Sequence, residues 1–323
     1  MKSIILITPW FGKFPKYFPL WLKSATYNCT IDFLIPTDSV PDGIEIPPNV
    51  RFLITSLEAI RNNLCVITGM DIVLKDPYKL CDYKPLYGLL YEKIVSQYDF
   101  WGYCDMDLVF GDLRHFLSED ILQVYDKIYS TGQLTVFRVC PETLNLFKTE
   151  VNLAEWTDFT YQEVFSTEYI CHFDESAICK LADVAGLKTY RNCEYADVFA
   201  KYSSFVLCGI WDGYDIQFFE WERGTLRRQY FHDSFVDSME LAYVHLQKRK
   251  MKFYPECAIA DSFSIIPNQF LPSIGIVTIE QMINFSKKKP NLFYYQKRIK
   301  SVFLKLRQGA LSYHMILRER NNR

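Results

Sequence analysis

The residues with the clearest chemical potential are two aspartates separated by a single residue, Asp105 and Asp107. They follow the apolar segment 100–104, which predicts a buried strand, and side chains at positions i and i+2 of a strand share a face. Two carboxylates held so close repel each other unless a cation lies between them. Mn²⁺ or Mg²⁺ would supply that charge and would also bind phosphate oxygens. The alternative is that both aspartates are solvated acids of a turn.

The segment 105–111 is also similar to the nucleophile strand of haloacid-dehalogenase-type phosphatases, which makes a phosphatase the main competing enzyme class. Val109 fits the position two residues after the second aspartate. However, the motif of that family usually lies on the first strand near the N-terminus, whereas Asp105 comes late in this chain. The sequence also lacks a convincing later pair of acidic metal ligands in the pattern of that family.

A second group of chemically active side chains lies near residue 245. His245 precedes the basic residues Lys248 and Arg249. An imidazole can complete a carboxylate-bound metal site, and nearby cations can neutralise the phosphates of a departing nucleotide. We therefore expect His245 as the third metal ligand, with Lys248 and Arg249 at the diphosphate. Taken alone, a histidine beside basic residues is more often a surface group or a hydrogen-bonded core group.

Three polar residues, Lys79, Asp82 and Lys84, precede a predicted helix over 85–95. From such a position polar side chains can reach a nucleotide at the edge of a sheet. Lysine can pair with phosphate, and Asp82 can accept hydrogen bonds from a ribose or from a base N–H. These three residues are therefore predicted to bind the nucleotide part of a donor substrate. The alternative is an ordinary solvated loop in which Asp82 marks the entry to the helix.

The loop that follows the first predicted strand, 4–7, carries Thr8, Trp10 and Phe11. In an open α/β sheet, ligands gather beyond the carboxyl ends of the strands. We expect a base and ribose to lie there, with Trp10 or Phe11 available for stacking. Packing of these rings into the core is the alternative.

Two later segments carry further candidate residues, which would face an acceptor if the protein catalyses group transfer. Asp174 and Glu175 form an acidic pair, and one of these carboxylates could remove the proton of an acceptor hydroxyl. Their alternative role is to begin a helix, where acids interact favourably with the helix dipole. Trp211 and Asp212 are predicted to contact the acceptor, although Asp212 precedes a glycine and also reads as a turn residue.

The elements that must position these residues follow from the apolar pattern. Strands and helices alternate through the first hundred residues, which predicts an α/β layer with a mostly parallel sheet. We expect strands over 4–7, 31–35, 50–54, 100–104 and 134–139, helices over 20–27, 85–95 and 176–185, and a hairpin over 217–231. Ser176 is the expected N-cap of the helix 176–185.

Five segments together resemble the metal-dependent glycosyltransferases of the GT-A fold. They are 7–12, 78–88, 101–113, 172–175 and 243–249. Within that class the sequence is similar to a bacterial family found among capsule and exopolysaccharide enzymes. The resemblance implies a GT-A-like, Rossmann-like sheet flanked by helices, a smaller mixed acceptor-side region, and a nucleotide-sugar donor. It also implies a metal site at Asp105, Asp107 and His245.

One segment departs from this resemblance. In 133–140 we would expect a histidine before Leu134 and an asparagine after the strand, but the sequence reads Gln-Leu-Thr-Val-Phe-Arg-Val-Cys. Contacts to the acceptor are the part of the site that this departure puts in question.

Charge is distributed unevenly along the 323 residues. Segment 287–323 holds eleven Lys and Arg against the single acid Glu319, whereas the rest of the chain has 25 basic and 37 acidic side chains. A body of net charge −12 is not expected to bind nucleic acid. The basic tail shows apolar residues at helical spacing and predicts an amphipathic helix for an anionic membrane surface, or one docked on its own domain.

Length and composition set the domain organisation and the compartment. We expect a GT-A-like domain over 1–286, with a nucleotide-sugar half of about 1–140 and an acceptor half of about 141–286, followed by the tail 287–323. The ten cysteines form no zinc-like cluster, and the apolar runs are too short for a signal peptide or a membrane span. These features predict a cytoplasmic protein, peripheral at the inner face of the plasma membrane.

Together these observations predict a hexosyltransferase of bacterial surface polysaccharide synthesis. Its donor would be a UDP-sugar, with UDP-galactose as one candidate, and its cofactor Mn²⁺ or Mg²⁺. Its acceptor would be a glycan, with undecaprenyl diphosphate as a candidate lipid carrier. A different class remains open, because aromatic residues make up 16% of the chain. Their rings could serve a glycan-binding protein without catalysis.

Overall fold

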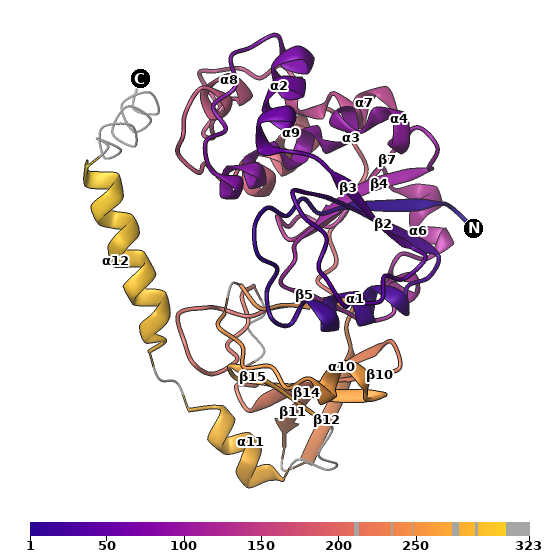
Figure 1. Cartoon of the computed structure of the whole chain (residues 1–323), viewed down its shortest axis with the longest axis vertical. Helices are drawn as coiled ribbons and strands as arrows, with labels where there is room; N and C mark the ends of the chain where they lie inside the picture. Colours follow the sequence, from indigo (N-terminus) through magenta and orange to yellow (C-terminus); the bar gives the residue numbers. More distant parts are fainter. Residues whose placement is uncertain (210–212, 234, 248, 273–277, 288–289, 308–323) are drawn as a thin grey trace.

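The computed structural model describes residues 1–209, 213–233, 235–247, 249–272, 278–287 and 290–307 (Figure 1). The fold is mixed α/β with a large, mostly parallel sheet. Its strands run in the order β3-β2-β1-β4-β7-β6-β8, and only β7 is antiparallel to its neighbours. These strands are β1 (Ile4–Ile7), β2 (Ile31–Thr37), β3 (Val50–Ile54), β4 (Phe100–Cys104), β6 (Lys127–Ile128), β7 (Leu134–Arg138) and β8 (Thr189–Tyr190).

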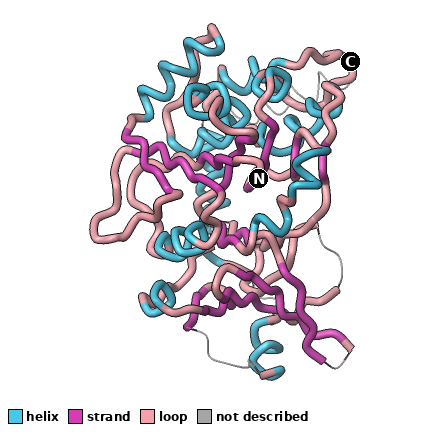
Figure 2. Tube along the Cα trace, turned by 90° about the vertical axis from the view of Figure 1, so that its right-hand side faces the viewer, coloured by secondary structure: helices cyan, strands magenta, loops and turns pink. Residues whose placement is uncertain are grey.

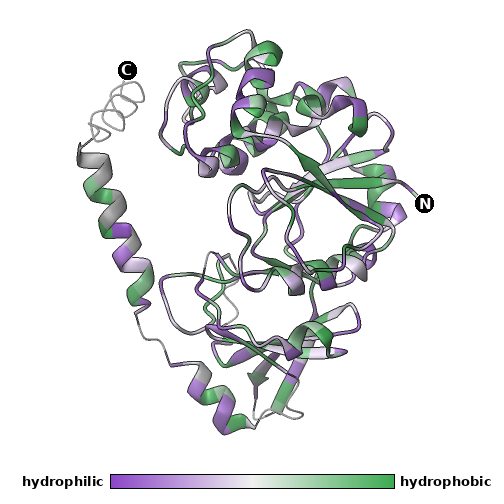
Figure 3. Cartoon of the chain, in the orientation of Figure 1, coloured by the Kyte–Doolittle hydropathy of each residue, from purple (hydrophilic) through white to green (hydrophobic). Residues whose placement is uncertain are grey.

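Helices cover both faces of this sheet, which explains why its central strands are continuous apolar runs. In β1, Ile5 and Ile7 enter one core cluster, whereas Ile4 and Leu6 enter the cluster on the opposite face. The green central strands in Figure 3 display this hydrophobic character. The first face packs against α2 (Leu57–Thr68), η1 (Pro77–Leu86), α3 (Tyr87–Leu90), α4 (Glu92–Val95), η2 (Leu146–Lys148), α8 (Tyr161–Phe165) and α9 (Ile178–Val184). The second packs against α1 (Phe18–Thr26), α5 (Leu113–Phe116) and α6 (Glu119–Val124).

Two predicted helices differ from the structure. The helix expected over 85–95 is divided into η1, α3 and α4, because Pro85 lies within a 3₁₀ segment and Tyr91 leaves helical geometry with φ −117° and ψ 30°. Ser176 does not cap the helix expected over 176–185. Its hydroxyl donates to Asp158 Oδ2, and α9 begins only at Ile178, after the π-helical turn η3 (Phe173–Ala177).

A second layer is built from smaller sheets below the large one (Figure 2). A five-stranded antiparallel sheet has the order β12-β11-β10-β14-β15. Its strands are β10 (Gln217–Glu222), β11 (Thr225–His232), β12 (Phe235–Glu240), β14 (Ser262–Ile266) and β15 (Gln269–Pro272). A three-stranded sheet consists of β5 (Leu108–Phe110), β13 (Tyr243–His245) and β9 (Ala196–Asp197). The hydrophobic cluster around Trp221 and Val244 joins the two sheets.

Short helices complete the chain: α7 (Pro141–Leu144), α10 (Glu256–Ile259) and α11 (Ile279–Phe285). The last described element, α12 (Leu292–Arg307), extends away from the sheets (Figure 1). Four of its apolar side chains, Leu292, Ile299, Val302 and Phe303, are 73%, 56%, 48% and 68% exposed. Among the described residues, no helix has both the length and the apolar character to cross a membrane.

Candidate functional site

Asp105, Asp107 and His245 come together where β4 ends. Each offers a ligand atom that lies within 4.8 Å of the other two. His245 Nε2 is 3.3 Å from Asp107 Oδ1 and 4.0 Å from Asp105 Oδ2. The antiparallel pairing of β5 with β13 sets His245 opposite Leu108, next to Asp107. Two carboxylates and an imidazole form a donor set that suits a divalent cation, and the imidazole favours Mn²⁺ over Mg²⁺.

The backbone of the two aspartates is fixed by its neighbours. The Asp105 N–H donates to the Gln133 carbonyl at 2.8 Å, and the Trp21 indole donates to the Asp105 carbonyl at 3.2 Å. The Asp107 carbonyl accepts the N–H of Leu246 at 3.1 Å. The site therefore rests on a rigid strand end, which keeps two like charges close together.

The imidazole of His245 is held from its other side by Asp197. Its Nδ1 lies 2.8 Å from Asp197 Oδ1. Burial opposes the charged form of the ring, but Asp107 and Asp197 outweigh it and raise the pKa of His245 to about 10. With no cation bound, His245 therefore carries a proton at neutral pH, and a metal ion must displace that proton.

Lys84 links the group of Asp105, Asp107 and His245 to the acidic pair at 174–175. Its ammonium group is buried and lies 2.7 Å from Asp105 Oδ1 and 2.9 Å from Asp174 Oδ2. It also donates to the Gly132 carbonyl at 2.6 Å. Burial favours the neutral amine, but Asp105 and Asp174 raise the pKa of Lys84 well above its ordinary value. Lys84 therefore stays charged and fixes the two carboxylates relative to each other.

The acidic pair itself divides into a buried and an exposed member. Asp174 is only 3% exposed, and burial raises its pKa to about 6 although Lys84 acts in the opposite direction. Its Oδ1 is buried and has no hydrogen-bond partner among the described residues. Glu175 is half exposed and pairs with His172 at 3.4 Å, and that contact lowers the pKa of Glu175. The two carboxylates therefore differ in their exposure to solvent and in the direction in which their pKa is shifted.

Gly132 allows this turn to approach the end of the sheet. A Cβ atom at Gly132 would lie 2.8 Å from Asp174 Oδ2 and 2.9 Å from Glu175 Cγ. Both distances are too short for unstrained contact, so a side chain here would displace the acidic pair. The sequence alone did not indicate a functional role for Gly132 or Asp197. The residue types around them carry no motif, and only the spatial arrangement identifies them.

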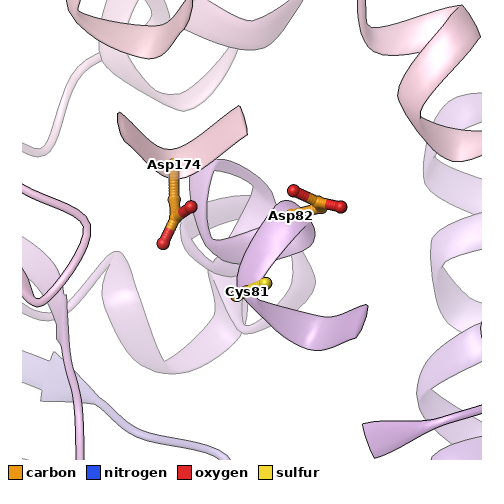
Figure 4. Close-up of side chains that lie close together, drawn as sticks. All are labelled: Cys81, Asp82 and Asp174. Carbon is orange, nitrogen blue, oxygen red and sulfur yellow. The ribbon is translucent and has the colours of Figure 1, made fainter. Parts of the chain in front are cut away.

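Lys79 and Asp82, which the sequence placed at the donor, have partners within the protein. Lys79 Nζ donates to Asp82 Oδ2 at 2.8 Å, and both side chains are buried. Asp82 also accepts the N–H groups of Cys171 and Phe173. Figure 4 shows that its carboxylate points away from Asp174, although Cys81, Asp82 and Asp174 lie close together. This buried pair therefore anchors the segment before Asp174, and its charged groups already have partners within the protein.

Thr8, Trp10 and Phe11 lie at the same sheet edge as Asp105. β1 is the parallel neighbour of β4, with Ile7 paired to Tyr103, so Thr8 follows β1 where Cys104 ends β4. Trp10 forms a parallel β-bridge to Thr37, the last residue of β2. Its indole N–H is buried without a partner in the described part of the chain. Phe11 is partly buried and packs against the core cluster on the first face of the sheet.

The remaining predicted residues are not at the metal cluster or lie outside the described residues. The Arg249 guanidinium is 2% exposed and donates to the carbonyls of Ser203 and Phe199 and to Asn268 Oδ1. These hydrogen bonds connect the loop around 199–203 to the turn at Asn268. Lys248, Trp211 and Asp212 lie outside the described residues.

A protein-family model described as "Family of unknown function (DUF6625)" matches residues 6–274 of this chain. The chain belongs to this family. The DUF6625 region contains the whole site, from Thr8 to His245, and ends before α11 and α12. No curated protein matches this chain.

Among solved structures, this DUF6625 chain is similar to the galactosyltransferase LgtC in complex with donor and acceptor sugar analogs. The identity is 12% and the TM-score 0.37, over 90% of this chain and 99% of that chain. It is also similar to an active-site mutant of LgtC, with 12% identity, TM-score 0.36 and coverage of 61% and 75%. A third similarity is to the glycosyltransferase GlyE of Streptococcus pneumoniae TIGR4, with 10% identity, TM-score 0.31 and coverage of 59% and 45%. Because all three TM-scores lie below 0.5, the proposed function rests on the side chains of the site.

Proposed function

We propose that the chain is a metal-dependent glycosyltransferase with a GT-A-like fold, which transfers a hexose from a nucleotide diphosphate sugar to a glycan hydroxyl. The convergence of Asp105, Asp107 and His245 at the carboxyl end of β4 carries this proposal. Mn²⁺ is the proposed cation. When bound, it would supply positive charge against the departing diphosphate. UDP-sugars, including UDP-galactose, are the first donors to test.

Lys84 and Asp174 are proposed to position the donor sugar. The unpaired Oδ1 of Asp174 is a buried acceptor, and a sugar hydroxyl is a donor that would satisfy it. Lys84 holds Asp174 and Asp105 in one arrangement, so the same ammonium group aligns the sugar and the diphosphate. Thr8, Trp10 and Phe11 remain the proposed contacts for the base and ribose, because they lie beyond the neighbouring strand.

Glu175 is proposed to receive the proton of the acceptor hydroxyl. It is half exposed, whereas Asp174 is enclosed by Lys84 and Gly132. The lowered pKa of Glu175 keeps this carboxylate ionised at neutral pH. Because its side chain is exposed to solvent, Glu175 can contact an incoming acceptor glycan directly. Trp211 and Asp212 remain predicted acceptor contacts.

The acceptor is proposed to be lipid-linked, with undecaprenyl diphosphate as the candidate carrier and α12 at an anionic membrane surface. Two observations support this. Leu292, Ile299, Val302 and Phe303 of α12 are exposed, and segment 287–323 carries eleven basic residues against one acid. A basic amphipathic helix of this kind binds in the interface of anionic lipids. The same contact would bring the enzyme to bacterial surface polysaccharide precursors.

A panel of nucleotide sugars tests the proposal directly. The full chain is incubated with UDP-, GDP- and CMP-sugars, Mn²⁺ and glycan acceptors, and release of the free nucleotide is measured. Acceptor-dependent release that chelation abolishes is the expected result. Saturable glycan binding without nucleotide release would instead support a glycan-binding protein. Phosphate release from simple phosphomonoesters would support the phosphatase.

A further inference from the structure

Asp197 lies directly behind the histidine of the metal cluster. It ends β9, which pairs in parallel with β13 and sets Asp197 opposite His245. Asp197 Oδ1 is 2.8 Å from His245 Nδ1, while Nε2 of the same ring faces Asp107 at 3.3 Å. The ring is thus held between two carboxylates, one on each nitrogen. Asp197 meets only the nitrogen that points away from the cluster.

The position of Asp197 is itself tightly determined. Gln247 Nε2 donates to Asp197 Oδ1 at 2.8 Å, and the N–H of Ala200 donates to Gln247 Oε1 at 3.3 Å. Gln247 has φ 47°, in the left-handed region that residues other than glycine seldom adopt. Such a conformation persists only where surrounding contacts determine it, and these conformations cluster at functional sites.

We propose that Asp197 is a positioning residue that orients His245 and increases its affinity for a divalent cation. This inference rests on the proposed metal site. A histidine that binds a metal through one ring nitrogen usually donates the N–H of the other to a carboxylate or carbonyl. That hydrogen bond fixes the tautomer and the ring plane and makes the ligating nitrogen more basic. Asp197 fulfils this role for Nδ1, so that Nε2 presents its lone pair to the cation.

Two substitutions at Asp197 separate orientation from charge. Asp197→Ala removes the acceptor, whereas Asp197→Asn keeps an acceptor oxygen and removes the charge. Binding of Mn²⁺ alone is measured by the electron paramagnetic resonance signal of the free ion. Asp197→Ala should weaken binding roughly 10- to 100-fold, and Asp197→Asn by a smaller factor. Asp261→Ala is the matched control, because Asp261 is exposed and forms its ion pair with the exposed Arg223.

The ring nitrogens of His245 give a readout that a loss of stability alone would not move. The chain has five histidines, so the long-range ¹H–¹⁵N spectrum of the imidazoles is simple to assign. With Mg²⁺ as a diamagnetic probe, the native protein should show His245 neutral and protonated at Nδ1. Asp197→Ala should give a mixture of tautomers, and Asp197→Asn should largely keep the native pattern.

The outcomes distinguish this inference from the proposed function. If the native chain binds no Mn²⁺, the proposed metal site fails and this inference fails with it. If the native chain binds Mn²⁺ and Asp197→Ala binds it equally well, only the role of Asp197 is refuted. A fall in the metal-free unfolding temperature of both variants, with unchanged tautomers, would show that Asp197 is merely structural.

Discussion

The ammonium group of Lys84 lies 2.7 Å from the carboxylate of Asp105, the first residue of the proposed metal site. The same group bridges to Asp174 at 2.9 Å. The buried ammonium group of Lys84, in η1, therefore connects the end of β4 to the turn η3. This contact couples the proposed metal site to the acidic turn. A substitution at one of them is therefore expected to change the position or the charge of the carboxylate at the other.

Removing the charge of Asp107 should abolish both metal binding and transfer. Asp107→Asn keeps the size of the side chain but removes one of the two anionic ligands that a hard cation prefers. We expect Mn²⁺ binding and nucleotide release to fall to background, while thermal unfolding without metal remains cooperative. Asp261→Asn serves as the control. Full Mn²⁺-dependent turnover of Asp107→Asn would contradict the proposed site.

Replacing Lys84 should reduce stability as well as activity. Lys84→Met leaves the buried Asp174 without its cation, and loss of one partner of a buried ion pair costs about 3 to 5 kcal/mol in the free energy of unfolding. Adding Asp174→Asn should recover part of that loss, because no unpaired charge remains there. Denaturant unfolding of the two single variants and the double variant measures this coupling. Additive effects would show that the two residues do not interact.

The affinity for Mn²⁺ should increase with pH. The metal-free site holds a proton on His245, whose pKa is raised to about 10, and metal binding must release it. For a single proton, the apparent affinity rises about tenfold for each pH unit below that pKa. Titrations at about pH 6, 7 and 8 test this slope. Calorimetry in buffers of different ionisation enthalpy should report release of one proton.

The buried pair of Lys79 and Asp82 should contribute to stability and not to binding. Asp82→Asn weakens the contact to Lys79 and the hydrogen bonds from Cys171 and Phe173. We expect the free energy of unfolding to fall by about 3 kcal/mol, with Mn²⁺ affinity unchanged. A variant that unfolds normally but has lost affinity for the donor nucleotide would return Asp82 to the donor site.

Polar substitutions on the apolar face of α12 should weaken membrane binding. Ile299→Ser combined with Phe303→Ser removes two exposed apolar side chains from a basic helix. Flotation with phosphatidylglycerol vesicles should show less bound protein than for the native chain, and phosphatidylcholine vesicles should bind neither. Val66→Ser is the control, because Val66 is 84% exposed on α2. Equal binding of all three proteins to the anionic vesicles would refute this role.

Much of the framework could be predicted from local sequence. The strands 4–7, 50–54 and 100–104 coincide with β1, β3 and β4, because short apolar runs between turn residues encode buried strands. The helix α2 was missed although its signals are present. Ser56 accepts the N–H of Ala59 at its start, and Gly69 ends it in the left-handed conformation. Both caps are local signals that the sequence encodes at either end of α2.

The candidate site was only partly predictable. Asp105 and Asp107 are recognisable because their spacing and the preceding strand are contiguous in the sequence. The sequence also nominated His245, but only the pairing of β5 with β13 brings it to Asp107. In the sequence, Lys79, Asp82 and Lys84 form one polar group. Lys79 pairs locally with Asp82, three residues further on, whereas only the tertiary structure pairs Lys84 with Asp105.

The sequence by itself determined five of the seven strands of the large sheet, the acidic motif and the basic tail, because each depends on neighbours within a few residues. The tertiary structure decided which polar groups meet. Asp197 and His245 are 48 residues apart, and Lys84 and Gly132 are also 48 apart. Contacts over such separations depend on how the sheets pair and pack, which local periodicity does not encode.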